Sequence, residues 1–237
     1  MIIMAFDSTA KAASVAISDN EQLLALYNID NGLTQSELLL PMAENMLNSL
    51  HLSFDDVDAF TCSVGPGSFT GVRIGTALVK GLAFGKNLPC IEVSTIEALA
   101  YNCLGMDGLI VPVMDARRGQ VYTALFESKD GVITRLCDDQ ALSLEALSEI
   151  LTDYNGESIY LVGDGYQITK AFLASKGIET KTTPPLLIAE NAYSCARVAY
   201  IKHQSGQYKS DTEFAPTYLR LPQAERERLE KLQNSKQ

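Results

Sequence analysis

A short glycine-rich turn is the segment whose residues could most directly do chemistry. Gly65, Pro66 and Gly67 break an apolar run, and Ser68 or Thr70 can cap the helix that follows. A strand, a tight turn and a helix N-terminus can together present backbone N–H groups to an anion. The turn is not a Walker A loop, because Gly-x-x-x-x-Gly-Lys-Ser/Thr is absent. A purely structural turn is the alternative interpretation.

No other pattern in the sequence indicates a metal centre or an activated nucleophile. His51 and His203 are far apart, and no group of His, Cys and carboxylate residues has the spacing of metal ligands. Ser63 and Ser68 have no partner that the sequence can assign, so nothing supports a peptidase triad. The five cysteines are scattered without a C-x-x-C pair. We expect them to be reduced and packed as small apolar residues.

Composition and charge exclude several classes of protein. The chain has 237 residues, of which 46% are hydrophobic, enough for one large domain or two small lobes. No apolar run approaches the roughly 20 residues of a membrane span, and the first residues resemble a buried strand more than a signal peptide. We therefore expect a cytoplasmic protein. The net charge of −10 argues against strong RNA binding by the chain alone.

The elements that must position the turn follow from the spacing of apolar residues. The first half is expected to form strands at 2–7, 13–18 and 22–28, a helix at 34–51, a strand at 59–64, a helix at 68–84, a strand at 89–93 and a helix at 94–104. The glycine turn would then join the fourth strand to the second helix.

The second half repeats this order with weaker signals. Strands are expected at 109–114, 121–127, 132–136 and 158–162, and helices at 142–151, 167–176 and 188–203. Two similar halves predict an α/β fold with lobes at 1–105 and 106–213 and a cleft between them. Residues 214–237 would form a tail, and its charge run from Gln223 is expected to be a solvated helix or a frayed end.

The helix after the glycine turn is apolar on nearly every side. Only Arg73 and Lys80 carry charge, and Gly71, Gly75 and Gly81 each cost roughly 1 kcal/mol against alanine. A helix that is apolar all round must be buried all round, and its glycines would let another helix approach closely. The alternative is a central helix that lies wholly inside this chain.

The preceding helix has a surplus apolar face as well. Leu38 and Met42 lie off the stripe that Leu39, Ala43 and Met46 would turn to the core. Two neighbouring helices with surplus apolar faces predict a protein–protein contact surface. The residues expected in this partner interface are Leu38, Met42, Asn45, Gly71, Arg73, Gly75, Leu78, Val79 and Leu82.

Five segments, spread over nearly the whole chain, resemble the TsaB (YeaZ) family in sequence and in order. The most specific one contains the glycine turn, whereas the short Asp-Ser-Thr piece alone would mean little. The segments are Phe6-Asp7-Ser8-Thr9, Ser36-Glu37-x-Leu39-Leu40-Pro41, Gly65-Pro66-Gly67-Ser68-Phe69-Thr70-Gly71-x-Arg73-Ile74-Gly75, Asp115-Ala116-Arg117-Arg118-Gly119-Gln120-Val121-Tyr122 and Pro216-x-Tyr218-Leu219-Arg220.

This resemblance implies a duplicated actin/sugar-kinase/Hsp70-like (ribonuclease H-like) fold and a partner role in tRNA modification. In that family a non-catalytic subunit pairs with TsaD, the catalytic subunit that transfers threonylcarbamoyl to a tRNA adenosine, and the ATPase TsaE joins them. The chain would then be a scaffold that forms a homodimer when alone and meets tRNA only through the complex. It would bind no cofactor or metal by itself, and ATP with Mg²⁺ would be possible only in the complex.

The ATPases of that fold leave an enzyme as the rival function. Their first strand ends in Asp-x-Gly-Thr, where the aspartate helps to hold Mg²⁺ and the glycine lets the backbone approach phosphate. Asp7 is present here, but Thr9 stands in the glycine position and its branched side chain would crowd that approach. We interpret Asp7, Ser8, Thr9 and Asp115 as a vestigial nucleotide-site loop; the alternative is that Asp7 simply ends a strand and bonds turn amides. The rival is an ATP-dependent kinase or phosphohydrolase that uses Asp7 and Asp115.

Two further pairs of residues have open roles. Arg117 and Arg118 are either an exposed turn pair or a small positive site at the cleft or the partner rim. Tyr218 and Leu219 are expected to pin the tail to the body of the protein by packing against it.

Overall fold

The first β-sheet grows from the apolar start of the chain. In the computed structural model, which describes residues 1–220, β1 (Ile2–Asp7) lies at the centre of a five-stranded sheet with the order β3-β2-β1-β4-β5. Its other strands are β2 (Ala13–Asp19), β3 (Gln22–Ile29), β4 (Ala59–Ser63) and β5 (Cys90–Val93). The first three strands pair antiparallel, and β4 and β5 continue parallel to β1. This arrangement is that of a ribonuclease H-like sheet and confirms the predicted fold class.

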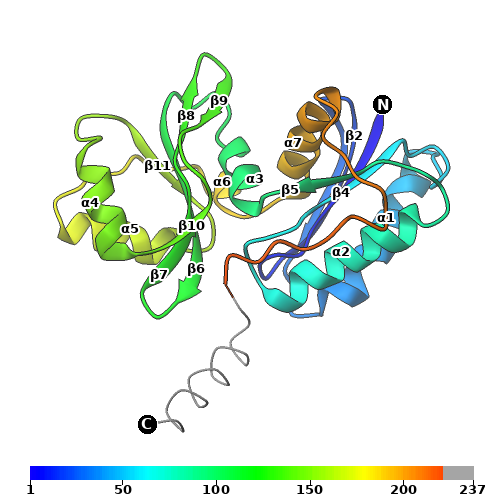
Figure 1. The fold of residues 1–237 in the computed structure, drawn as a ribbon, viewed down its shortest axis with the longest axis horizontal. Helices are drawn as coiled ribbons and strands as arrows, with labels where there is room; N and C mark the ends of the chain where they lie inside the picture. Colours follow the sequence, from blue (N-terminus) through cyan, green and yellow to red (C-terminus); the bar gives the residue numbers. More distant parts are fainter. Residues whose placement is uncertain (221–237) are drawn as a thin grey trace, which may run out of the picture.

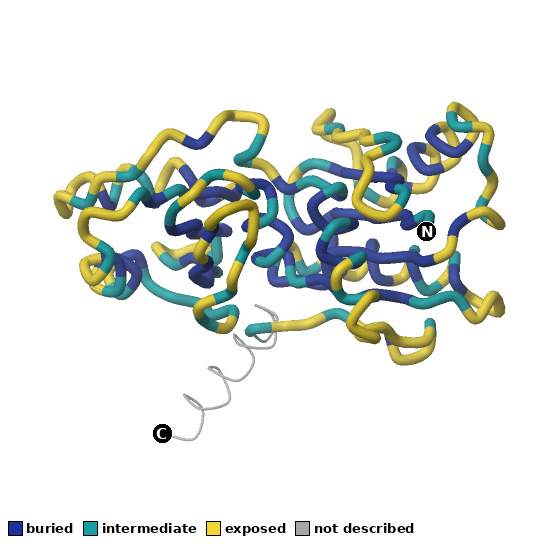
Figure 2. The backbone as a smooth tube through the Cα atoms, turned by 90° about the horizontal axis from the view of Figure 1, so that it is seen from above, coloured by how far each residue is buried: buried dark blue, intermediate teal, exposed yellow. Residues whose placement is uncertain are grey.

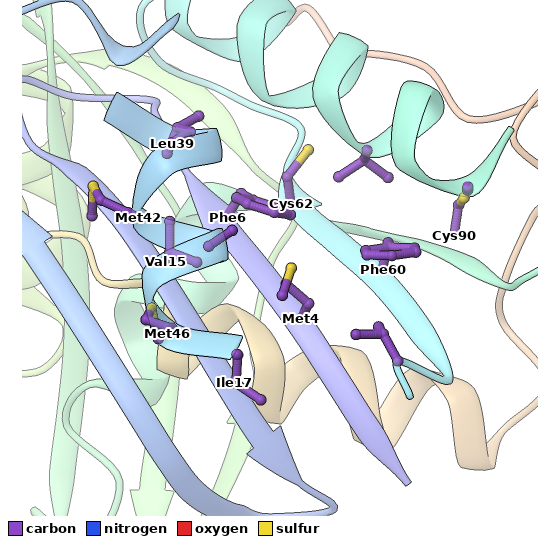
Figure 3. Packing of buried hydrophobic residues seen from close by; sticks show 14 of the residues in the cluster. Met4, Phe6, Val15, Ile17, Leu39, Met42, Met46, Phe60, Cys62 and Cys90 are labelled. Carbon is purple, nitrogen blue, oxygen red and sulfur yellow. The ribbon is translucent and has the colours of Figure 1, made fainter. Parts of the chain in front are cut away.

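Helices cover both faces of this sheet (Figure 1). On one face lie α1 (Gln35–Ser49) and α2 (Phe69–Ala83), over a core in which Phe6, Leu39 and Phe60 are completely buried or nearly so. Figure 3 shows side chains of α1, among them Leu39 and Met42, meeting those of the sheet, among them Phe6, in this core. Because side chains alternate along β1, the other face carries Ile3 and Ala5, which pack against a second layer of helices.

The second lobe repeats the start of this sheet. It contains β6 (Gly108–Arg117), β7 (Gln120–Thr123), β8 (Phe126–Lys129), β9 (Val132–Arg135), β10 (Gln140–Ser143) and β11 (Ile159–Val162). β7 and β8 both pair antiparallel with β6, β10 pairs with β7, β9 pairs with β8, and β11 pairs parallel with β6. One side of this sheet packs against α4 (Leu144–Thr152) and α5 (Tyr166–Ser175).

The strand predicted at 121–127 is present but interrupted. The pairs Val113–Thr123 and Ile110–Phe126 lie on one antiparallel register, so β7 and β8 are two parts of one extended segment. In that register the gap lies opposite Pro112, which has no N–H to donate to a ladder. If β7 and β8 count as one strand, and β9 and β10 as another, the second lobe has the strand order of the first lobe without its fifth strand. We did not predict β10.

The helices between the lobes require a correction to the predicted boundaries. The helix predicted at 188–203 corresponds to α7 (Ala192–Gln204), which begins later, after the N-cap Asn191, and the short α6 (Pro185–Ile188) before it was not predicted. Although α7 falls within the predicted second lobe at 106–213, it packs against the sheet of the first lobe. In turn α3 (Thr95–Tyr101) contributes Ile96 and Leu99 to the core of the second lobe. The chain therefore crosses between the lobes more than once (Figure 1).

Residues 205–220, which we call the strap, return along the edge of the first lobe. Lys209 makes an antiparallel bridge with Cys90, so the strap covers the edge that β5 would otherwise expose. Phe214 is its anchor, with only 1% of its surface exposed, whereas the predicted anchor Tyr218 is 41% exposed. Figure 2 shows the strap mostly as exposed tube. The predicted charge run from Gln223 lies outside the described residues.

Within residues 1–220, no helix is both long enough and apolar enough to cross a membrane.

Candidate functional site: the glycine turn, the cleft and the outer face of α2

The glycine turn is squeezed between two other segments of the chain. A Cβ atom on Gly67 would lie 2.7 Å from the Cβ of Thr9, and one on Gly65 would lie 2.5 Å from the carbonyl oxygen of Thr217. Both glycines have positive φ angles, which L side chains rarely adopt. The turn thus brings together the β1–β2 connection and the strap.

Three amides near this turn, those of Ser68, Gly71 and Val72, are used by the chain itself. The N–H of Ser68 donates to the carbonyl oxygen of Thr9 at 2.7 Å, and the N–H of Gly71 donates to the Oγ of Ser68 at 3.3 Å. Val72 donates to the carbonyl oxygen of Ser68, as in a regular first turn. Donors with partners of this kind are not free to bind an anion. The geometry favours the structural interpretation of Gly65, Gly67 and Ser68.

Asp7 is locked by its own neighbours. Its side chain is 2% exposed, and it accepts hydrogen bonds from the N–H of Thr9 at 2.9 Å, the Oγ1 of Thr9 at 2.7 Å and the Oγ of Ser63 at 2.5 Å. Burial raises the pKa of Asp7, and the bonds from Ser63 and Thr9 act in the opposite direction. Both carboxylate oxygens are therefore occupied, as expected for an aspartate that ends a strand and bonds a turn amide.

Asp115 lies in a different environment from Asp7. It lines the space between the lobes, where its carboxylate accepts hydrogen bonds from the N–H of Arg117 at 2.7 Å and from the Nη1 of Arg117 at 3.3 Å. Its own N–H donates to the Oδ1 of Asp164 at 2.8 Å. The predicted pair is thus divided, because Thr9 and not Asp7 reaches the wall of the cleft.

The cleft between the lobes is a cavity of about 500 Å³ whose wall is part polar and part apolar. Its first-lobe side includes Thr9 and Phe69, and its second-lobe side includes Asp115 and Arg117. The end of the strap also lines it, and the guanidinium carbon of Arg220 lies 5.5 Å from the ring centre of Tyr122 in the second lobe. The strap therefore reaches from one lobe to the other at the cleft.

Arg117 and Arg118 lie in an exposed turn, and Arg117 also lies at the cleft, so both locations considered for this pair are found. Arg117, Arg118 and Gly119 all have positive φ angles and form the exposed turn between β6 and β7. Arg117 also contributes to the wall of the cleft, where it pairs with Asp115. That pairing offsets part of the charge of Arg117, whereas Arg118 is exposed at the tip of the turn.

Four residues of the predicted partner interface lie inside the chain, which corrects that prediction. Met42, Gly71, Gly75 and Val79 are all buried. A Cβ atom on Gly71 would lie 1.8 Å from the carbonyl oxygen of Ser8, and one on Gly75 would lie 2.8 Å from the Oγ of Ser8. These glycines let α2 approach its own sheet and not a second protein.

The opposite side of α2 remains uncovered. Ala77 and Gly81 are exposed, a Cβ atom on Gly81 would meet nothing within 4 Å, and Phe84 at the end of the helix is 78% exposed. We call the following residues of α1 and α2, all exposed or half-buried, the outer face: Leu38, Asn45, Ile74, Ala77, Leu78, Gly81, Leu82 and Phe84. It includes four of the nine predicted interface residues, and the role of these four stays a prediction.

Arg73, also predicted for the interface, is exposed at the strap side of α2. Its guanidinium carbon lies 3.9 Å from the ring centre of Phe69, and its Nε donates to the hydroxyl of Tyr218 at 3.0 Å. The rings of Phe69 and Tyr218 are 4.8 Å apart. The family segment that ends in Tyr218-Leu219-Arg220 thus contacts the segment that begins at the glycine turn, which spacing in the sequence could not show.

Metal ligands and reactive thiols do not gather elsewhere in residues 1–220. That part of the chain has no group of three or more His, Cys, Asp and Glu side chains that could hold a metal ion. The five cysteines are free, and all except Cys137 are buried. Burial raises the pKa of Cys103 and Cys195 to about 12, so these thiols stay protonated and unreactive.

Comparison with known proteins gives a consistent family. The model of the family TsaD, tRNA N6-adenosine threonylcarbamoyltransferase, matches residues 34–227. The chain is 31% identical to the tRNA threonylcarbamoyladenosine biosynthesis protein TsaB of Bacillus subtilis, over 95% of this chain and 96% of that protein. It is 30% identical to the TsaB protein of Escherichia coli, over 93% of this chain and 95% of that protein.

Solved structures agree with the fold. YeaZ from Pseudomonas aeruginosa aligns with a TM-score of 0.75 and 22% identity, over 92% of this chain and 99% of that one. A second structure from the same organism, described as an uncharacterized protein with similarity to peptidase YeaZ, aligns with a TM-score of 0.78 and 23% identity, with the same coverage. With the identities to the curated relatives over nearly their full lengths, these findings show that the chain belongs to the TsaB family.

Proposed function

We propose that this chain is a non-catalytic scaffold subunit in tRNA threonylcarbamoyladenosine biosynthesis, and that it binds a catalytic subunit of the TsaD type through the outer face. The role in tRNA threonylcarbamoyladenosine biosynthesis is proposed because the curated relatives from this family are named for it. The observation that carries the proposal is the outer face itself, a largely apolar surface on two adjacent helices whose residues are exposed or only half-buried. Exposed apolar surfaces of this kind are typical of protein–protein contacts.

The buried acid at the end of β1 supports a role without catalysis. An aspartate that binds Mg²⁺ has to turn a carboxylate oxygen toward the ligand site. Asp7 has three donors from its own chain and no access to the cleft. The rival kinase or phosphohydrolase would also need free amides at the glycine turn, and the N–H of Ser68 is already bonded to Thr9.

Shared architecture supports the choice of partner. The TsaD family model matches most of this chain, so a catalytic subunit of that family would present helices equivalent to α1 and α2. Two related surfaces of this kind can pack about a pseudo-twofold axis, and two copies of this chain can do the same as a homodimer. Homodimer and heterodimer would then compete for one surface. The ATPase TsaE and the tRNA would join the heterodimer in the cytoplasm, and ATP with Mg²⁺ would bind only there. This fits the net charge of −10.

One pair of matched variants tests the interface. Ala77 is exposed on α2, and Ala174 is exposed on α5 of the other lobe. Ala77→Glu would place an unpaired charge in the proposed contact, and we expect binding of the catalytic subunit to weaken by at least about tenfold, since burying such a charge costs several kcal/mol. Ala174→Glu adds the same charge at a site that the proposal leaves free, so its affinity should match that of the unmodified chain.

Calorimetric titration of each variant into purified catalytic subunit gives the affinities, and modification of tRNA by the assembled complex gives the consequence. The proposal predicts parallel losses of affinity and modification for Ala77→Glu alone. Equal affinities for the two variants would show that the partner binds elsewhere.

A further inference from the structure

The chain segment at 187–192, which links the lobes through the end of α6 and the start of α7, is tied to both of them. The N–H of Gly163 in the second lobe donates to the carbonyl oxygen of Ile188 at 2.7 Å. The Nδ2 of Asn28 in the first lobe donates to the carbonyl oxygen of Glu190 at 3.1 Å. Ala192 then donates its N–H to the Oγ of Ser14 on β2 at 2.9 Å. The position of this segment therefore depends on the relation between the two lobes.

Asn102, at the end of α3, also binds segment 187–192, and α3 lies where the chain first passes from the first lobe to the second. Its Nδ2 donates to the carbonyl oxygens of Leu187 at 2.9 Å and Ala189 at 2.8 Å. Its Oδ1 accepts from the Nδ2 of Asn191 at 2.8 Å and from the Oγ of Ser194 at 2.6 Å. A side-chain amide can make four hydrogen bonds, and all four are made here.

Glu190 is the exception in this well-bonded junction. Its side chain is 6% exposed, and its Oε1 has no hydrogen-bond partner among the described residues. Two carboxylates repel a negative charge on Glu190, that of Asp7 in the first lobe and that of Asp164 in the second. Burial first, and these two acids after it, raise the pKa of Glu190 to about 8. A carboxylate without a nearby cation is costly to bury, so burial favours the neutral form, and backbone hydrogen bonds from Glu190 and Asp164 offset only part of the rise in pKa.

We propose that Glu190 is a proton-dependent lock between the lobes, whose neutral form stays buried in the junction and whose ionisation loosens it. When Glu190 ionises, a second negative charge is buried in the chain besides that of Asp7, and the entry of water or a movement of the lobes would relieve it. The hydrogen bonds of segment 187–192 are the contacts that such a movement would break.

The direction of the pH dependence follows from the proton balance. The folded state holds the Glu190 proton up to a higher pH than the unfolded state, in which a glutamate has its ordinary pKa of about 4.3. The stabilising contribution of the proton is complete below that value, declines as the pH rises, and is gone above a pH of about 8. Glu190→Gln keeps the shape of the neutral side chain and cannot ionise.

Thermal unfolding of the whole chain between pH 5 and pH 9.5 tests the lock. The melting temperature of Glu190→Gln should exceed that of the unmodified chain by a margin that grows up to a pH of about 8 and then stays constant. Glu179→Gln, an exposed glutamate in the same lobe as Asp164, is the matched control and should show no such trend. A margin for Glu190→Gln that does not change with pH would overturn the proposal.

Amide hydrogen exchange supplies the local readout. Between pH 6.5 and pH 9, after correction for intrinsic rates, protection of the amides in segment 187–192 should fall by at least about tenfold in the unmodified chain and stay unchanged in Glu190→Gln. Equal protection at both pH values in the unmodified chain would refute the lock. If Glu190→Gln does not fold, carboxyl ¹³C NMR of the unmodified chain decides: titration of Glu190 at pH 7 or above supports the proposal, and titration below pH 7 overturns it.

Discussion

Gly71 and Ser8 touch each other backbone to backbone. A Cβ atom on Gly71 would lie 1.8 Å from the carbonyl oxygen of Ser8, and the Oγ of Ser8 donates to the carbonyl oxygen of Gly71 at 2.8 Å. This contact fixes the first turn of α2 against the end of β1. The glycine-rich side of α2 is therefore its inner side, and a partner can reach only the outer face.

The first prediction contrasts two glycines of the same helix. Gly71→Ala should destabilise the protein by about 3 kcal/mol or more, because the new methyl group meets backbone atoms that cannot move aside. Gly81→Ala points into open space and should stabilise it by up to about 1 kcal/mol through helix propensity. Urea unfolding followed by circular dichroism measures both, and changes of the same sign would contradict the packing described here.

The second prediction concerns the buried aspartate. Asp7→Ala leaves the donors of Ser63 and Thr9 without their acceptor, and each buried unpaired donor costs about 1–3 kcal/mol, so the chain should unfold at lower urea concentration. At a temperature where the variant is still folded, the complex should modify tRNA at the normal rate. Asp7→Asn, which retains one acceptor oxygen, is the milder control. Loss of modification with folding and partner binding intact would show that Asp7 has a catalytic role after all.

The third prediction ranks the contacts of the strap. Phe214→Ala removes a buried ring and should cost about 3–5 kcal/mol of stability, which would free the strap from α2. Tyr218→Phe removes only an exposed hydroxyl that accepts from Arg73, and should cost less than about 1 kcal/mol. Urea unfolding of the two variants decides the ranking. A larger loss for Tyr218→Phe would restore Tyr218 as the principal anchor.

The fourth prediction uses the thiols as probes of the core. Cys137 is half-buried, whereas Cys62, Cys90, Cys103 and Cys195 are buried and burial raises the pKa of each of them. The native chain should therefore react rapidly with a thiol reagent at Cys137 alone, and at all of its cysteines after denaturation. Cys137→Ser should abolish the rapid phase. A rapid phase that survives this substitution would show that the core opens more easily than its packing indicates.

Local pattern was sufficient to predict most of the fold. The strand that became β1 is a short apolar run that ends in Asp7, and the helix that became α2 begins at a capping serine, so propensity and packing agree. The exchange of α3 and α7 between the lobes was not predictable in this way. Which sheet a helix covers depends on the path of the chain in space, and the spacing of apolar residues records only that a helix has an apolar face.

In the candidate site, too, the sequence predicted local features and missed those that depend on the path of the chain. Apolar character all round α2 correctly indicated close packing on its inner side, but it could not separate the chain's own sheet from a partner, so Gly71 and Gly75 were assigned to the wrong contact. Gly81 and Phe84 carried a weak signal, since a glycine and a phenylalanine near a helix end have many possible roles. The isolation of Glu190 depends on three segments distant in the sequence, and no local pattern could reveal it.

The most direct test of the account is an amide hydrogen-exchange footprint of this chain with and without the purified catalytic subunit. We predict that binding slows amide exchange in the peptides that cover α1 and α2, residues 35–49 and 69–84. Exchange in the peptides that cover α4 and α5 should not change. The same peptides should become less protected when a homodimer of the chain is diluted to monomer. Protection confined to the cleft, or to the second lobe, with α1 and α2 unchanged would contradict the proposed interface and with it the scaffold role.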